Sequence, residues 1–374
     1  FAASGPWYLP TGHILYSQYD RVTAVPFNIA TLSTQGDAVD VTEPDMAVAD
    51  MFQAQLAYSS EGTLIYAPAY DPGYAQRTLH WVDREGNETD LPLPPRRYIT
   101  PRISPDGTHL AVTLVDDNWE IWVYNLATGE GHPITNDAGN DYAPAWSPDG
   151  QKLIFASRRM GNFNVFETSM TGVGGANRLY PNDFRQTPGA YMPDGEHVLF
   201  NLSKPHEDAS EIGMLALGPE STYTTITSSP NIGHPLPSPN GEWVAFVDRA
   251  SQDARIEVFI ARIDSPTERH QVSVGGGTEP VWAPDGSELF FRSENTLHAA
   301  TIHYEPELQI DPPEQLFADV YHNDGSSRMY DVSPDGQKFL MLRLLPRETI
   351  RVTELYMVEN WFEDIRRRVP RSTN

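Results

Sequence analysis

The chain has 374 residues, of which 51 are acidic and 26 basic, so its formal net charge at pH 7 is −25. This charge argues against a general role in binding nucleic acid or anionic membrane surfaces, because phosphate groups repel it. Cysteine is absent, which excludes disulfides, thiolate nucleophiles and cysteine-ligated metals. No apolar run of about 18 residues occurs, so no membrane insertion is expected within this chain.

A short turn sequence recurs along the chain. Its clearest copy is Ser147-Pro148-Asp149-Gly150, which is followed by the apolar triplet Leu153-Ile154-Phe155. Proline presets φ at the second turn position, aspartate bonds nearby backbone N–H groups, and glycine accepts positive φ. Each copy therefore predicts a hairpin of two short strands.

The turn occurs in eight copies, of which the first two are degenerate. Their glycines are Gly12, Gly62, Gly107, Gly150, Gly195, Gly241, Gly286 and Gly336, at spacings of 43 to 50 residues. Such a period, with four short strand segments in each copy, is typical of β-propeller blades. We therefore expect an all-β fold: an eight-bladed β-propeller of four-stranded antiparallel blades, forming a single domain over residues 1–374.

The end of the chain departs from this period. The last copy lacks an outer strand after Val358, so we expect the N-terminal residues before Pro10 to pair there and close the ring. Residues 360–369 predict a short terminal helix with a cap at Asn360. Its apolar residues fall on one face, which we expect to pack on the ring: Trp361, Phe362, Ile365 and Val369.

The motif from Trp146 to Phe155 resembles the PD40 or TolB-like branch of the WD40-like β-propellers, and this resemblance covers nearly the whole chain. More narrowly, residues 5–16, 78–86, 275–282 and 360–363 resemble the propeller that follows the kinase domain in bacterial membrane-bound serine/threonine kinases. That resemblance implies an extracytoplasmic sensory or binding module, periplasmic or secreted. It leaves open a tether upstream of Phe1.

Motifs for catalysis are absent from the sequence. No kinase motif, Gly-x-Ser-x-Gly elbow, His-Glu-x-x-His or P-loop occurs. The repeated aspartates 106, 149, 194, 285 and 335 are explained by the turns. Residues 136–141 and 322–324 offer oxygen ligands suited to calcium, although neither has the spacing of a known loop site. We expect no cofactor, with calcium left open.

The candidate site follows from propeller topology, because the loops that enter the innermost strands share the face opposite the Pro-Asp-Gly turns. The loops on this face bring together Arg97, Tyr98, Asp141, Tyr142, Arg158, Arg185, His234, Glu279 and Arg328, with Arg159, Lys204, Arg249 and Arg292 nearby. In so acidic a chain these arginines predict a positive funnel for a small anionic ligand, a peptide carboxylate or a protein partner. The alternative is that the arginines are solvated or bridge neighbouring blades.

The leading hypothesis for function is a non-catalytic module that binds at the channel mouth. The alternative is a propeller hydrolase or lyase with its site there. Enzymes of this fold place several His, Asp or Glu side chains together, and here only His234, Asp141 and Glu279 are expected to converge. A propeller that only scaffolds subunits is a third hypothesis.

Overall fold

The computed structural model of the chain describes residues 4–18, 21–41, 48–49, 53–54, 56–66, 76–116, 118–137, 139–204, 209–218, 221–249, 255–323, 325, 327–345 and 355–370. The chain divides into two compact units. One comprises Gln76–Leu345, and the other comprises Phe1–Ala75 with Pro346–Asn374. That both units act as one domain over residues 1–374 stays a prediction.

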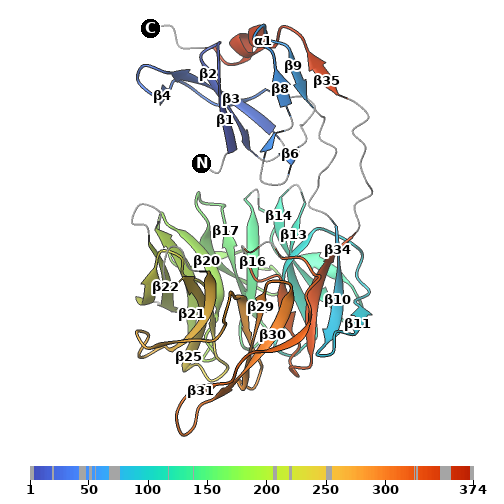
Figure 1. The fold of residues 1–374 in the computed structure, drawn as a ribbon, viewed down its shortest axis with the longest axis vertical. Coiled ribbons are helices and arrows are strands. Elements are labelled where there is room, and N and C mark those ends of the chain that lie inside the picture. Colours follow the sequence, from blue (N-terminus) through green and yellow to red (C-terminus); the bar gives the residue numbers. More distant parts are fainter. Residues whose placement is uncertain are drawn as a thin grey trace. The chain divides into compact units, whose positions relative to one another are not determined.

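The unit Gln76–Leu345 contains six antiparallel sheets within its described residues (Figure 1). Five of them are built from strands that follow one another in sequence. The first two sheets contain β12 (Tyr98–Ile103), β13 (His109–Val115), β14 (Trp119–Asn125) and β15 (Gly131–Pro133), and then β16 (Asp141–Trp146), β17 (Lys152–Ser157), β18 (Asn164–Ser169) and β19 (Asn177–Arg178). The next two contain β20 (Arg185–Tyr191), β21 (His197–Lys204), β22 (Ala209–Ala216) and β23 (Tyr223–Ser229), and then β24 (Gly233–Pro237), β25 (Trp243–Arg249), β26 (Ile256–Arg262) and β27 (Arg269–Gln271). The fifth contains β28 (Thr278–Trp282), β29 (Glu288–Ser293), β30 (Thr296–His303), β31 (Gln309–Ile310) and β32 (Glu314–Ala318).

The sixth sheet joins the two ends of this unit. Its order is β11 (Glu88–Asp90), β10 (Arg77–Asp83), β34 (Lys338–Leu344), β33 (Tyr330–Val332). Strands β10 and β34 pair along their whole length, from Arg77 opposite Leu344 to Asp83 opposite Lys338. Because β33 also contacts β12, the six sheets close into a ring without any strand from outside residues 76–345.

The expected eight-bladed ring is not confirmed, because two repeats exchange strands. The hairpin of β33 and β34 takes β10 as its third strand, although β10 follows the second turn glycine, Gly62, in sequence. The second repeat's own hairpin, β8 (Leu56–Tyr58) and β9 (Leu64–Tyr66), instead pairs with β35 (Tyr356–Val358). The expected closure by the N-terminal segment is wrong, since β1 (Ser4–Leu9) pairs with β2 (His13–Gln18).

The recurring turns are formed as predicted. All eight turn glycines have positive φ, between 69° and 91°. In the clearest copy, Ser147 Oγ donates to Asp149 Oδ1 at 2.6 Å, and Gln151 N donates to the same carboxylate at 3.0 Å. Because the aspartate side chain holds the turn backbone together, its structural interpretation is confirmed.

The tryptophan before a turn joins neighbouring sheets. Trp146 Nε1 donates to the carbonyl oxygen of Arg102 in the preceding sheet at 2.9 Å, and Trp282 Nε1 does the same to Leu236 at 3.1 Å. The indole rings thus bury apolar area between sheets and satisfy a buried backbone acceptor. This contact fixes the inner strands relative to one another, and the inner strands carry the site described below.

The other unit holds the remaining strands: β3 (Arg21–Asn28), β4 (Ser33–Thr34), β5 (Val39–Asp40), β6 (Val48–Ala49) and β7 (Gln53–Ala54), with β1, β2, β8, β9 and β35. Helix α1 (Trp361–Arg368), red in Figure 1, lies against the blue N-terminal strands. Its apolar face is buried as predicted, but it packs on Leu9, Leu15 and other residues of its own unit.

The contact between α1 and the turn that joins β8 to β9 depends on Gly62. Gly62 has φ +91°, and a Cβ there would lie 2.9 Å from the ring of Phe362, so only glycine fits. Its carbonyl accepts a hydrogen bond from Trp361 N at 2.8 Å. Asn360 is the N-cap residue, as predicted, but its backbone is left-handed and its side chain makes no capping hydrogen bond. Among the described residues, no helix has the length and apolar character to cross a membrane.

Candidate binding site

The ring of six sheets contains a cavity of about 330 Å³. Its wall is formed by the first strands of five sheets, β12, β16, β20, β24 and β28, and by the loop that precedes β33 in the sixth. Residues from β21, β25 and β26 complete it. All six sheets therefore contribute to one cavity, although the contributing residues extend from Arg102 to Arg328 in sequence.

A β-bulge interrupts the first strand in each of these five sheets. In four of them a proline follows a residue of positive φ: Thr100 (49°), Ala143 (56°), His234 (53°) and Glu279 (55°). Proline has no N–H for the ladder, so it fits at a bulge. Left-handed φ is costly outside glycine and marks sites where the surrounding structure enforces it. Three of these four residues line the cavity.

Glu279 is held on several sides. Its carboxylate accepts hydrogen bonds from Met329 N at 2.6 Å and from Arg292 Nη1 at 3.4 Å, and its side chain is fully buried. Its carbonyl oxygen accepts from the hydroxyl of Tyr330 at 3.0 Å. The Arg292 guanidinium also contacts Asp319 at 2.8 Å. Glu279 therefore ties β28 to the sixth sheet, and its charge is already matched by a buried cation.

Two further arginines meet at the seam between β12 and β33. Arg102, which is 8% exposed, donates from Nη1 to the carbonyl oxygens of Pro101 at 2.6 Å and Arg328 at 3.0 Å. Arg328 Nη2 lies 3.6 Å from Asp331, whose other oxygen accepts from Ile103 N. Within the described part of the chain, neither Arg102 Nε nor Arg328 Nε has a hydrogen-bond partner.

Tyr142, which lines the cavity, packs against a second aromatic side chain, Phe163. Tyr142 is buried, and its ring packs edge-on against Phe163 with centroids 4.8 Å apart. Its hydroxyl accepts a hydrogen bond from Arg185 Nη2 at 2.9 Å and lies 3.0 Å from Thr187 Oγ1. The exposed Arg185 guanidinium thus lies over aromatic rings, with a defined position at the cavity wall.

Five of the nine predicted site residues line the cavity: Tyr142, Arg185, His234, Glu279 and Arg328. The sequence argument therefore brought together residues that the fold also brings together. It missed Arg102, Thr187, Asn201 and Ser203, which lie on the same wall. A proline follows each of the four positive-φ residues at the bulges, and Arg102 comes directly after one of these prolines, Pro101. This pattern in the sequence could have identified Arg102.

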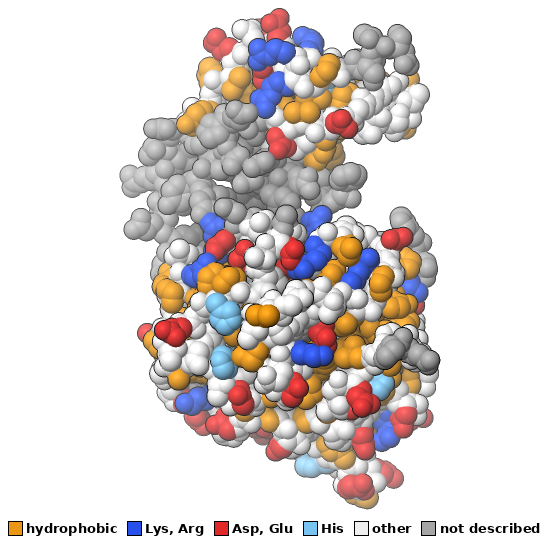
Figure 2. All heavy atoms as spheres, turned by 180° about the vertical axis from the view of Figure 1, so that it is seen from behind, with side chains coloured by type: hydrophobic (Ala, Val, Ile, Leu, Met, Phe, Trp, Pro, Cys, Tyr) orange, Lys and Arg blue, Asp and Glu red, His pale blue; other side chains and the backbone are white. Residues whose placement is uncertain are grey.

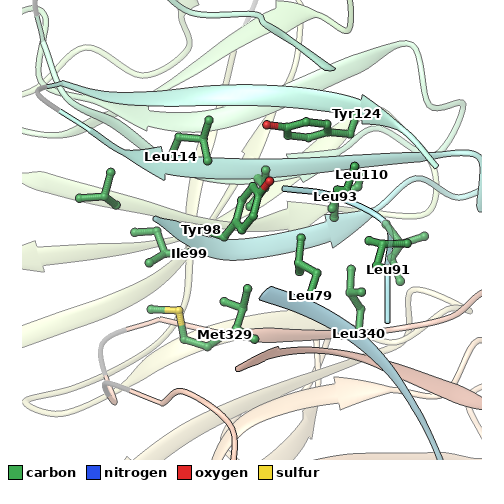
Figure 3. Close-up of a cluster of buried hydrophobic side chains, with 14 residues drawn as sticks. Leu79, Leu91, Leu93, Tyr98, Ile99, Leu110, Leu114, Tyr124, Met329 and Leu340 are labelled. Carbon is green, nitrogen blue, oxygen red and sulfur yellow. The ribbon is translucent and has the colours of Figure 1, made fainter. Parts of the chain in front are cut away.

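Two of the other predicted residues come from the start of β12. Tyr98 is completely buried in the cluster shown in Figure 3, and its hydroxyl donates to the carbonyl oxygen of Pro94 at 2.7 Å. It is a core residue and is removed from the candidate site. Arg97 lines a separate pocket with Arg96 and Asp116.

Asp141 and Arg158 also lie off the cavity wall. Asp141 is 1% exposed and accepts a hydrogen bond from Arg159 Nη2 at 3.1 Å. Burial raises the pKa of Asp141, while hydrogen bonding and the Arg159 charge oppose this shift. Arg158 is exposed, with its guanidinium carbon 5.4 Å from the centroid of the Phe163 ring. Neither side chain belongs to the cavity as the structure defines it.

Three of the nearby loop cations form ion pairs within their own sheets, so these ion pairs do not bridge neighbouring blades. Arg159, Lys204 and Arg292 each form an ion pair, with Asp141, Glu211 and Asp319 respectively. On the surface shown in Figure 2, blue and red side chains are interspersed over Gln76–Leu345. The cavity wall differs, since it is lined by three arginines, Arg102, Arg185 and Arg328, and by one carboxylate, Glu279.

The calcium expectation finds no support in the described residues, where no three His, Asp or Glu side chains are placed to hold a metal ion. Ala138 and Asp324, which belong to the two candidate segments, lie outside the described residues.

Comparison with known proteins gives consistent matches. A family model described as the TolB beta propeller domain matches residues 57–256, which are 200 of 374 residues. A Tol-Pal system protein TolB of Francisella tularensis is 30% identical over 174 residues, 46% of this chain and 39% of its own length. The uncharacterized peptidase YuxL of Bacillus subtilis is 33% identical over 110 residues, 28% of this chain and 17% of its own length. The chain therefore spans less than half of either relative.

Solved structures show the same fold. A putative TolB from Agrobacterium tumefaciens superposes with a TM-score of 0.60 at 18% identity, covering 74% of this chain and 100% of that chain. TolB from Acinetobacter baumannii gives a TM-score of 0.50 at 16% identity, covering 88% of this chain and 80% of that chain. At such low identity the likeness concerns the fold alone, and it confirms the propeller that the repeats predict.

Proposed function

Because the chain belongs to the TolB beta propeller domain family, we propose that it is a non-catalytic binding module that holds a ligand or a protein segment in the cavity of its ring. The observation that supports this most directly is the cavity wall, to which all six sheets contribute. Concave sites that combine apolar walls with a few polar groups are the usual places for ligands.

The composition of the wall favours binding over catalysis. Of the three acid or base residues expected to converge, His234 and Glu279 line the cavity and Asp141 does not. The Glu279 carboxylate is already engaged by Arg292 and by the backbone N–H of Met329. A general base needs a free lone pair within reach of a substrate proton, so this carboxylate is poorly prepared for that role.

The setting of this module is also part of the proposal. A sensory or binding role outside the cytoplasm, with a peptide, a protein or a small anionic molecule as partner, agrees with the resemblance to the propellers of bacterial membrane-bound kinases. The name of the Francisella relative places that protein in the Tol-Pal system. For this chain we propose only the shared feature, a propeller that binds a partner at its ring.

Calorimetric titration of the purified chain with a panel of peptides and acidic metabolites tests this proposal. Arg185→Ala removes an exposed cation from the wall, and Arg262→Ala removes a partly exposed cation paired with Asp264 elsewhere on the ring. We expect Arg185→Ala to weaken binding and Arg262→Ala to leave it unchanged. Equal effects of the two variants would contradict binding in the cavity. Turnover of a panel member that is lost in His234→Ala would favour the alternative, a hydrolase or lyase.

A further inference from the structure

The strongest unexplained feature of the cavity is its positive charge. Three arginines and one carboxylate are on the wall, in a chain whose formal net charge is −25. The carboxylate, Glu279, is paired with Arg292, which lies behind the wall. Of the three arginines, Arg328 lies 3.6 Å from Asp331, a carboxylate that is not on the wall, whereas Arg102 and Arg185 form no ion pair among the described residues.

Arg102 is the most constrained of the three. It is buried, and its hydrogen-bond acceptors are two neutral carbonyl oxygens, those of Pro101 and Arg328. Among the described residues, its Nε has no hydrogen-bond partner, and the negative charges of Asp331 and Glu279 act on it from a distance. A buried cation whose hydrogen bonds go to neutral acceptors is costly, because it has lost its hydration.

The second arginine increases this cost. Burial, followed by the positive charge of Arg328, lowers the pKa of Arg102 to about 9. Arg102 and Arg328 are neighbours, and both line the cavity. An anion placed beside them would gain Coulomb energy from both.

Resting on the proposed function, we infer that the cavity recognises a carboxylate group through Arg102 and Arg328, on an otherwise uncharged organic ligand. The planar fork of arginine matches the two oxygens of a carboxylate. The nearby apolar wall, with Pro188, Pro235 and Val247, suits a carbon skeleton attached to that group. The Glu279 carboxylate on the same wall disfavours a dianion such as phosphate.

Two sources carry this chemistry: the C-terminus or acidic side chain of a peptide, and a small organic acid. The experiment uses matched pairs that differ only in charge. N-acetylated tripeptides with uncharged side chains and a free C-terminus are compared with their C-terminal amides, and butyrate is compared with butyramide. Inorganic phosphate is the third probe. Affinities are measured on the full chain by calorimetry and by the shift in melting temperature that a ligand causes.

We expect at least one acid of these pairs to bind at least tenfold more tightly than its amide, and phosphate to bind more weakly than that acid. Arg328→Gln should remove this preference, whereas Arg262→Gln, at a partly exposed site outside the cavity, should preserve it. Arg102→Lys keeps the charge without the fork and should reduce the preference. Because Arg102 also supports the backbone, Arg328→Gln remains the deciding variant if Arg102→Lys fails to fold.

The outcomes distinguish failure of the carboxylate inference from failure of the proposed function. If an amide binds as well as its acid, and Arg185→Ala weakens both, the carboxylate inference is wrong while the binding module stands. If phosphate binds better than every acid, the ligand chemistry is wrong. If no acid causes heat or a thermal shift at millimolar concentration, the inference also fails. If ligands bind but no cavity variant affects them, both the inference and the proposed function fail.

Discussion

Arg102 and Arg328 are 226 positions apart in the sequence, yet Arg102 Nη1 donates a 3.0 Å hydrogen bond to the carbonyl oxygen of Arg328. The same seam is held by Ile103 N, which donates to Asp331 Oδ2 at 2.8 Å. This is where the first complete sheet of the ring meets the sheet that joins its two ends. The candidate site therefore depends on ring closure, because closure places these two arginines together.

Residues 76–345 should fold without the rest of the chain, because β10 supplies the third strand of the last sheet from inside this range. We expect this fragment to unfold in one cooperative transition in urea, followed by circular dichroism. Leu342→Ala should destabilise it by about 2–5 kcal/mol, since Leu342 is fully buried in the cluster that includes Leu79. A fragment without a cooperative transition would contradict this account of closure.

Gly150→Val should destabilise the protein by roughly 1–3 kcal/mol, because a β-branched residue is strained at the observed φ of +69°. A Cβ at this position would meet only Pro105 Cδ at 3.8 Å, so the cost comes from the backbone and not from a clash. Gly150→Asn is the matched control, since asparagine tolerates left-handed φ and should cost less. Equal losses from the two variants, measured by urea unfolding, would argue against backbone strain.

Asp106→Asn should change how the melting temperature depends on pH. Hydrogen bonds from Ser104 and Thr108 lower the pKa of Asp106 to about 2 from its usual value. The ionised carboxylate therefore stabilises the folded state above about pH 4, and this contribution is lost as the pH falls toward about 2. Part of the drop in melting temperature over this range should disappear in the variant.

The chain itself contains the control for this substitution. Asn240 occupies the same turn position, where Oδ1 accepts hydrogen bonds from Ser238 Oγ and from Glu242 N. Asparagine can therefore keep the main turn contacts, and we expect little change in melting temperature at pH 7. A large loss at pH 7, or an acid response identical to that of the unaltered chain, would show that the charge of Asp106 is not the cause.

Tyr98→Phe should cost about 1 kcal/mol, since it removes the hydrogen bond to the carbonyl oxygen of Pro94 and keeps the ring in the core. Tyr142→Phe removes a hydroxyl that contacts Arg185 and Thr187 at the cavity. We expect only Tyr142→Phe to alter ligand affinity in the calorimetric panel. Loss of affinity in Tyr98→Phe, with stability unchanged, would return Tyr98 to the site.

These two tyrosines show why the candidate site was only partly predictable. The sequence argument aligned Arg97-Tyr98 with Asp141-Tyr142, but Tyr98 is three residues before the bulge proline of its strand and Tyr142 is two before. A shift of one residue moves a strand side chain to the opposite face of a sheet. Alignment on the prolines would have separated the core tyrosine from the cavity tyrosine.

The sequence by itself determined the local elements. Each of the eight turns and each apolar strand after it lies where the pattern predicts, because turn chemistry and strand alternation depend on neighbouring residues. Only the tertiary structure decided which strands pair. Strands β9 and β34 are both apolar strands after a glycine turn, so either is locally suited to β10 or β35. Long-range packing distinguishes them, as when Phe339 on β34 packs against Phe290 and Trp361 on α1 packs near Tyr58. That choice gives a ring of six sheets, and it places Arg102 beside Arg328.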